Sequence, residues 1–144
     1  MGYRMKVTGL SNEIAVDERA ITKVVFDSDT PDETNARATD YGLSVKVHGR
    51  MLFDLQASVP DPTLDLALWS QVPSYKGDCY REFELEVIAA SQTVRKFTLP
   101  NAFVMEYAET LDDLTGVGDF YLHVKQKKDQ NAVVKIEGGF AAEE

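Results

Sequence analysis

Apolar and polar side chains alternate with a period of two along most of the chain. Around Phe83, Leu85 and Val87 the pattern is sharpest, because a glutamate stands between successive apolar residues. Such alternation is typical of strands with one buried and one solvated face. Strands are predicted over seven ranges, the fourth and fifth split by Pro100: Ala20–Ser28, Tyr41–Leu52, Tyr80–Ala90, Thr93–Leu99, Ala102–Leu111, Asp119–Lys128 and Ala132–Phe140.

One segment has a helical pattern instead. Asp61 suits an N-cap, and the proline after it suits the first helical position. Leu64 and Leu68 lie one turn apart, with Trp69 beside them. The pattern predicts a single helix over Asp61–Val72 that covers an opening or a face of the sheet, with Trp69 as its core anchor.

These elements predict a mainly β protein with one short α-helix. The strand number suits a small β-barrel or a sandwich of two packed sheets. The 144 residues are one domain's worth, and no break in composition marks a second domain, so we expect a single domain over residues 1–144.

Charge and composition exclude several classes of function. The net charge of −9 argues against nucleic acid as a partner, because phosphate binding needs a basic face. No apolar run is long enough to span a membrane, and the N-terminus lacks the pattern of a signal peptide, so neither insertion nor classical export is expected. The single cysteine, Cys79, excludes an internal disulfide and suits a reducing cytoplasm.

Candidate catalytic groups are few. His48 and His123 are the two histidines, each on the polar face of a predicted strand, without the ligand spacing of a metal site. Cys79 could act as a nucleophile beside a histidine, but a lone cysteine at the start of a strand is more often structural. The chain also lacks a nucleophile elbow, a P-loop and a dinucleotide-binding glycine pattern.

Two acidic groups have simple explanations. The first group is Asp27, Asp29 and Asp32. It resembles a calcium loop but lacks the turn glycine and the terminal glutamate of such a loop, so a solvated loop is expected. The second group is Glu82, Glu84 and Glu86, which could suggest paired acids for hydrolysis, yet their strict alternation favours a solvated or interface-facing strand edge. We therefore predict no enzyme, no metal and no cofactor.

A long polar connection, Asp27–Gly42, interrupts the strands. Connections beyond about 12–15 residues are uncommon in compact domains unless they are functional or disordered. A polar arm that docks on a neighbouring subunit would explain both its length and its polarity. The candidate interface residues in it are Asp32, Asn35, Arg37, Thr39 and Asp40.

The order of parts from Val24 to Lys128 resembles a known family. A strand and the long connection lead to "LSVKVHG", then to a helix with an aromatic residue near its end, "LDLALWSQV". The segments "REFELEVIAASQTVRKFTLPNAFVMEYAETLDD" and "GDFYLHVKQKK" follow. This order is similar to that of the tube proteins of contractile injection systems, namely the hemolysin-coregulated proteins of type VI secretion and the tail tube proteins of contractile phages. The chain departs from them in its scarcity of glycine- and serine-rich loops and in "VPSYKGDCY".

The resemblance implies a tail-tube-like fold of two packed sheets with a helix at the side. It implies that about six copies close into a ring through a heterologous interface, and that rings stack into a hollow tube. Partners would be other copies, sheath and baseplate or spike proteins, and cargo effectors. Assembly would take place in the cytoplasm, before release or injection as part of a phage-like particle. The candidate lumen or interface faces carry either Glu82, Glu84 and Glu86, or His123, Lys125 and Lys127.

Two alternatives remain open. The first is a monomeric β-barrel binding module, with an apolar pocket around Trp69, Tyr75 and Tyr80. The second is a membrane-associated protease, a label that some similar sequences carry. The residues of this chain give that label no support.

Overall fold

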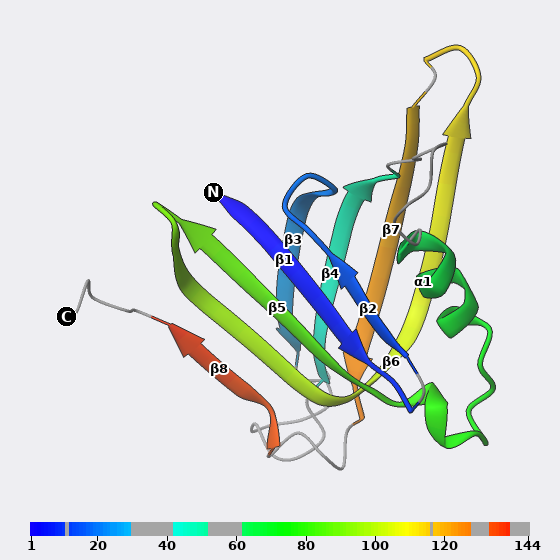
Figure 1. Ribbon diagram of the computed structural model, residues 1–144. Coiled ribbons are helices and arrows are strands. Elements are labelled where there is room, and N and C mark those ends of the chain that lie inside the picture. The colour runs from blue at the N-terminus through cyan, green and yellow to red at the C-terminus, as the bar shows by residue number, and fades with distance from the viewer. Residues whose placement is uncertain (11, 30–41, 52–61, 116, 128–132, 139–144) are drawn as a thin grey trace.

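The computed structural model describes residues 1–10, 12–29, 42–51, 62–115, 117–127 and 133–138 (Figure 1). Over these ranges the chain forms eight strands, one α-helix and one short 3-10 helix. Their bounds are β1 Gly2–Thr8, β2 Glu13–Val16, β3 Ile21–Asp29, β4 Gly42–Arg50, α1 Pro62–Ser70, η1 Gly77–Cys79, β5 Arg81–Ala89, β6 Gln92–Asp112, β7 Val117–Gln126 and β8 Lys135–Gly138.

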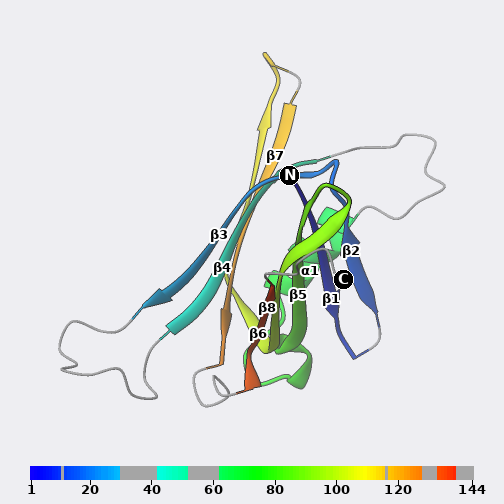
Figure 2. The ribbon, with the colours of Figure 1, turned by 90° about the vertical axis from the view of Figure 1, so that its left-hand side faces the viewer.

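The strands belong to one antiparallel sheet in the order β2-β1-β5-β6-β7-β4-β3, with β8 also paired to β6. The long strand β6 belongs to both halves of this sheet. Its residues 92–102 pair with β5 in one half, and its residues 102–112 pair with β7 in the other. Contacts between β1 and β3 show that the halves fold toward each other, and Figure 2 shows β3 and β4 on one side and β1, β2 and β5 on the other. The mainly β fold with one short helix is confirmed, and its two layers are continuous through β6.

The prediction that Pro100 splits two strands is wrong, since β6 runs through it as one strand of 21 residues. The pairing with β5 shifts between Leu99 and Ala102, so the proline lies in an irregularity where no regular ladder bond is lost. The next backbone N–H, of Asn101, donates to Oε1 of the buried Gln126 over 3.2 Å.

The sequence pattern predicts no strand in the first 19 residues, yet β1 and β2 lie there. Their signal is the same alternation in shorter form, with Met5 and Val7 buried in β1 and Ile14 and Val16 buried in β2. In β1 basic residues separate the apolar ones, and β2 has only four residues. Together they complete the second half of the sheet beside β5.

The core lies between the two halves. The apolar faces predicted for β4, β5 and β7 are buried there, confirming the alternation in these strands. The buried members are Leu43, Val45, Val47, Phe83, Leu85, Phe120, Leu122 and Val124, whereas Val87 is only partly buried.

Helix α1 closes the side of the core near β2 and β6. Trp69 is buried as predicted, and its Nε1 donates to the carbonyl of Cys79 over 2.9 Å. The helix packs through Thr63, Leu66 and Trp69, whereas Leu64 and Leu68, the pair that indicated the helix, are 57% and 58% exposed. On this side the helix contacts β6, where the hydroxyl of Tyr107 donates to the carbonyl of Thr63 over 3.3 Å.

Candidate assembly surfaces

The predicted interface residues of the long connection lie outside the described residues. These are Asp32, Asn35, Arg37, Thr39 and Asp40. The structure shows instead where the connection is attached: β3 continues to Asp29 and β4 begins at Gly42, so the ends of the predicted segment are strand.

Four strands form a half-sheet with two open edges. We define it as β3, β4, β7 and residues 103–112 of β6. Within the described parts of the chain, β3 pairs only with β4, and residues 103–112 of β6 pair only with β7. Each outer strand therefore offers unpaired backbone groups on its outer side, which is how edge strands recruit another chain.

The outer face of the half-sheet is polar. The pairing places Lys46 of β4, His123 of β7 and Glu106 of β6 in one row across the strands. In the adjacent rows, Lys125 lies opposite Ser44, and His48 lies against Tyr121 with 4.8 Å between ring centroids. Two members of the predicted face, His123 and Lys125, thus share this surface.

The third predicted member, Lys127, has a different environment. It follows the end of β7, and its Nζ lies 5.1 Å from the ring centroid of Tyr80. Tyr80 packs edge-on against Phe103 at 5.9 Å. Lys127 therefore lies at the end of the half-sheet, beside the residue that pairs with Lys125.

Burial of His123 has an electrostatic consequence. Its Nε2 is buried without a hydrogen-bond partner in the described structure. Burial and the nearby Lys46 and Lys125 lower the pKa of this histidine, while Glu106 and Asp27 act in the opposite direction. The neutral imidazole is therefore favoured on this face.

The predicted glutamate face lies on the other half of the sheet, on β5. Glu84 approaches Nζ of Lys96 at 3.9 Å, and Glu86 approaches Arg4 at 3.8 Å. Glu82 is exposed on the same strand. These cross-strand ion pairs give a charge-matched outer surface, in which two of the three carboxylates face basic side chains.

The residues weighed for catalysis do not form a site. Burial raises the pKa of the Cys79 thiol, whereas a nucleophilic cysteine needs a lowered pKa. In the described ranges no three His, Cys, Asp or Glu side chains are grouped so that they could hold a metal ion. No helix there is long and apolar enough to cross a membrane.

The proposed ligand pocket is not assembled either. Trp69 is enclosed in the core, Tyr80 packs against Phe103, and Tyr75 is 83% exposed. The three aromatic residues therefore have separate environments.

Sequence reasoning missed a cluster around the buried Arg81. Its guanidinium donates from Nη2 to Oδ2 of Asp78 over 2.6 Å and lies over the Trp69 ring at 5.5 Å. Asp78 also accepts the N–H of Leu10, and although burial raises its pKa, this bond and Arg81 lower it overall. The cluster joins the β1–β2 turn, η1, β5 and α1. Its only sequence signal is an acid three residues before an arginine.

Comparison with known proteins identifies the fold. No protein-family model and no curated protein sequence matches the chain. Among solved structures, the anti-feeding prophage baseplate has a chain that is 14% identical, with a TM-score of 0.55 and coverage of 95% of this chain and 93% of that one. Hcp1 from Flavobacterium johnsoniae is 11% identical, with a TM-score of 0.53 and coverage of 94% and 96%.

Hcp1 from E. coli EAEC 042 is 8% identical, with a TM-score of 0.52 and coverage of 96% of this chain and 99% of that one. All three matches extend over almost the whole of both chains. The tail-tube-like fold suggested by the sequence is thus confirmed.

Proposed function

We propose that this protein is a structural subunit that closes into rings and stacks into the inner tube of a contractile injection apparatus. The observation that carries the proposal is the half-sheet with two different open edges. The resemblance in sequence order and the fold shared with Hcp1 support the same role. The role is structural and not enzymatic.

The strand directions permit closure. Every neighbouring pair in the half-sheet is antiparallel, so β3 runs opposite to β6. Placing β3 of one copy beside residues 103–112 of the next therefore continues the antiparallel order. Such a contact is heterologous, and repeating it around an axis closes a barrel without free edges. Six copies are proposed, because the similar baseplate structure is 6-fold symmetrised.

Closure of the ring also determines which face of the half-sheet lines the lumen. One face of the half-sheet is covered by the core and by the second half of the sheet. In a closed barrel this second layer fits outside the wall, where there is more room. The face with Lys46, His48, His123 and Lys125 then lines the lumen, and the face with Glu84 lies outside.

The long connection, with Asp32, Asn35, Arg37, Thr39 and Asp40, is proposed to reach a neighbouring subunit. Sheath and baseplate or spike proteins would bind the assembled tube, and cargo effectors would travel inside it. We place assembly in the cytoplasm and the finished tube in a released or injected particle.

Proline at the open edge of β6 tests the proposal. Adjacent N–H groups in a strand point to opposite sides, so of Ala108 and Glu109 one faces β7 and the other faces the open edge. Ala108→Pro and Glu109→Pro are compared by thermal unfolding, light scattering and negative-stain microscopy. The proline facing β7 should lower stability, whereas the outward proline should leave the monomer folded and prevent ring formation.

The unmodified protein provides the reference. It should form rings of about six copies, the closed cyclic arrangement expected of a heterologous interface. A parent protein that stays monomeric at every concentration contradicts the ring. Ring formation by both proline variants contradicts the assignment of this edge.

A further inference from the structure

The polar face of the half-sheet carries a square of four polar side chains on its two central strands. Lys46 of β4 lies opposite His123 of β7, and two residues along each strand Ser44 lies opposite Lys125. The two lysines therefore occupy opposite corners, and His123 and Ser44 occupy the other two. We call these four residues the lysine square. Figure 2 shows no other described strand or helix over this side of β4 and β7.

The lysines of the square have no carboxylate in contact with them. Within the described parts of the chain, neither Lys46 nor Lys125 takes part in an ion pair or a hydrogen bond. Between them, Nε2 of His123 is buried without a hydrogen-bond partner. A buried polar atom left in this way costs free energy. An anion above the square would give all three groups a partner.

Two acids flank the square on its outer sides. Asp27 of β3 lies opposite Ser44, and Glu106 of β6 lies opposite His123. Each acid is therefore two strands away from the lysine of its own row. The central strands present the basic groups, and the outer strands present the acids.

The charges around His123 sum to a positive site. Burial has the largest effect on the pKa of this histidine and lowers it. Among the charged neighbours, Lys46 acts on this pKa more strongly than Glu106, and Lys125 more strongly than Asp27. The lysines thus outweigh the acids at the centre of the square, and such a potential attracts an anion.

The dimensions of the square suit a carboxylate. Strands about 4.8 Å apart and a two-residue repeat of about 6.8 Å place opposite corners about 8 Å from each other. A carboxylate whose two oxygens each accept a bond of about 2.8 Å from a different ammonium group spans nearly the same distance. The protonated ring of His123 can then donate from Nε2 to the same group.

We propose that the lysine square binds a carboxylate of an acidic peptide, through the ammonium groups of Lys46 and Lys125 and through Nε2 of His123. This site goes beyond the proposed ring, because all of its residues belong to one copy. Nucleic acid is a poorer ligand, since its successive phosphates would meet the flanking acids and the net charge of −9. The stacked pair of His48 and Tyr121 in the adjacent row offers an aromatic surface to the peptide beside its carboxylate.

Binding is coupled to protonation of His123. A bound carboxylate favours the imidazolium form, so the peptide raises the pKa of His123. By the same linkage, the peptide binds more tightly as the pH falls toward that value. This coupling distinguishes a carboxylate in the square from one held loosely by a surface lysine.

Histidine titrations with and without a hexaglutamate peptide test the site. The ring signals of the parent protein are followed by NMR between neutral pH and mild acid at constant ionic strength. The pKa of His123 should rise by about one pH unit, which corresponds to about tenfold tighter binding by the protonated form. His48 is the internal reference, and its pKa should change less.

Two double variants separate the square from general charge. Lys46→Met with Lys125→Met removes both ammonium groups and should abolish the rise caused by the peptide. Lys76→Met with Lys135→Met makes the same change in charge at two exposed lysines elsewhere and should leave the rise intact. Thermal unfolding checks that the variants are folded, and Lys125→Met alone gives the same test if the first pair does not fold. An equal response from both pairs overturns the proposal.

The parent protein gives the remaining outcomes. An oligothymidylate of six nucleotides should leave the pKa of His123 unchanged, and a rise equal to that caused by the peptide overturns the assignment to carboxylates. No response of His123 to the peptide in a protein that forms rings overturns the site and leaves the ring proposal standing. A response in a protein that never forms rings supports the site and contradicts the ring.

Discussion

His123 is the residue whose surroundings depart most from what its position suggested. Alternation placed it on a solvated face, yet its Nε2 is buried among Lys46, Lys125, Glu106 and Asp27. The lysines favour a neutral ring and the acids favour a charged one. Because burial is the largest effect, the pKa of His123 is lowered.

This shift predicts a loss of stability in mild acid. The unfolded chain takes up a proton near the ordinary histidine pKa of about 6.5, and the folded chain does so only at lower pH. The free energy of unfolding should therefore be at its plateau above that value and decrease as the pH falls through the folded pKa. His123→Gln should reduce the decrease, as measured by urea denaturation at several pH values.

The other histidine provides the control for this measurement. His48 lies on the same face, against Tyr121. His48→Gln should leave the acid-dependent decrease in place. An unchanged pH profile in the His123→Gln variant would contradict the assignment of the effect to His123.

At the scale of elements, the sequence predicted strands best where one strand buries one face. The alternating residues of β4, β5 and β7 meet that condition, and their buried sides are as expected except at Ser44, which is buried, and at Val87, which is only partly buried. β6 does not meet this condition, because its two segments pair with different strands, and Pro100 lies between the segments. The change from β5 to β7 as the pairing strand depends on residues far away in the sequence, so no local pattern indicates it.

The orientation of α1 was also decided by distant contacts. Leu64, Leu66 and Leu68 all lie within nine residues, and spacing alone did not show which of them is buried. The structure buries Leu66 beside Trp69. Leu66→Ala should therefore lower the free energy of unfolding by about 2–5 kcal/mol, through lost apolar contacts and a cavity.

Leu68→Ala is the matched control, since the same atoms are removed from a side chain that is more than half exposed. Its effect on the monomer should stay within about 0.5 kcal/mol. Urea denaturation of the two variants under identical conditions measures the difference. Equal destabilisation by both substitutions would contradict the observed face of the helix.

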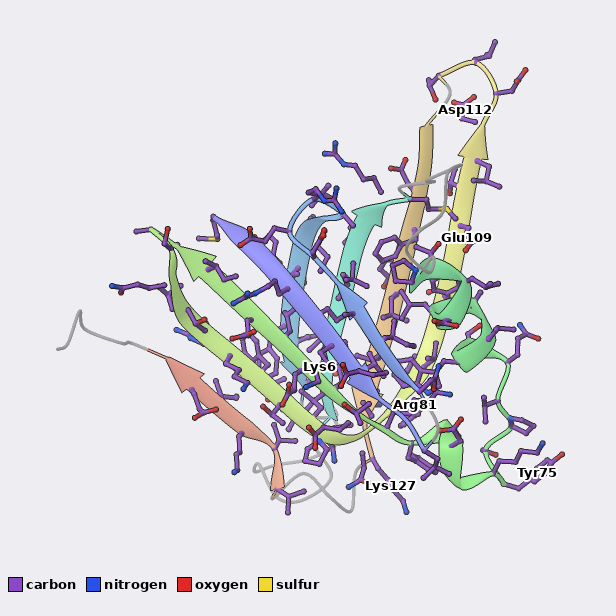
Figure 3. The ribbon with its side chains drawn as sticks, in the orientation of Figure 1. Lys6, Tyr75, Arg81, Glu109, Asp112 and Lys127 are labelled. Atoms are coloured by element: carbon purple, nitrogen blue, oxygen red, sulfur yellow. The ribbon has the colours of Figure 1, made fainter. Side chains whose placement is uncertain are left out.

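At the scale of the whole molecule, the sequence predicts a self-assembling subunit, but it does not predict the open strand edges on which the proposed ring depends. The open edges of β3 and β6 follow from a strand order in which chain neighbours such as β4 and β5 are far apart. Local alternation carries no information on that order. Asp112 and Lys127 lie at opposite ends of the β6–β7 pair, and this separation depends on the length of the hairpin, which the local sequence does not indicate (Figure 3).

The long connection after β3 gives the last prediction. It leaves from Asp29 at an open edge, so a chain of its length can reach the adjacent copy in the proposed ring. Arg37→Ala with Asp40→Ala should raise the concentration needed for assembly by about tenfold, as expected for loss of a polar contact between subunits. Thermal unfolding of the monomer should be unchanged, because the lost contacts lie between copies.

An ion pair on the outer half of the subunit is the control for this change. Lys6 and Glu13 approach within 3.5 Å on β1 and β2, away from both edges of the half-sheet. Lys6→Ala with Glu13→Ala removes one charge of each sign, as the loop variant does, and should leave assembly as in the parent. Light scattering over a concentration series compares the three proteins. Assembly of the loop variant at the parental concentration would show that ring closure depends on the strand edges without the connection.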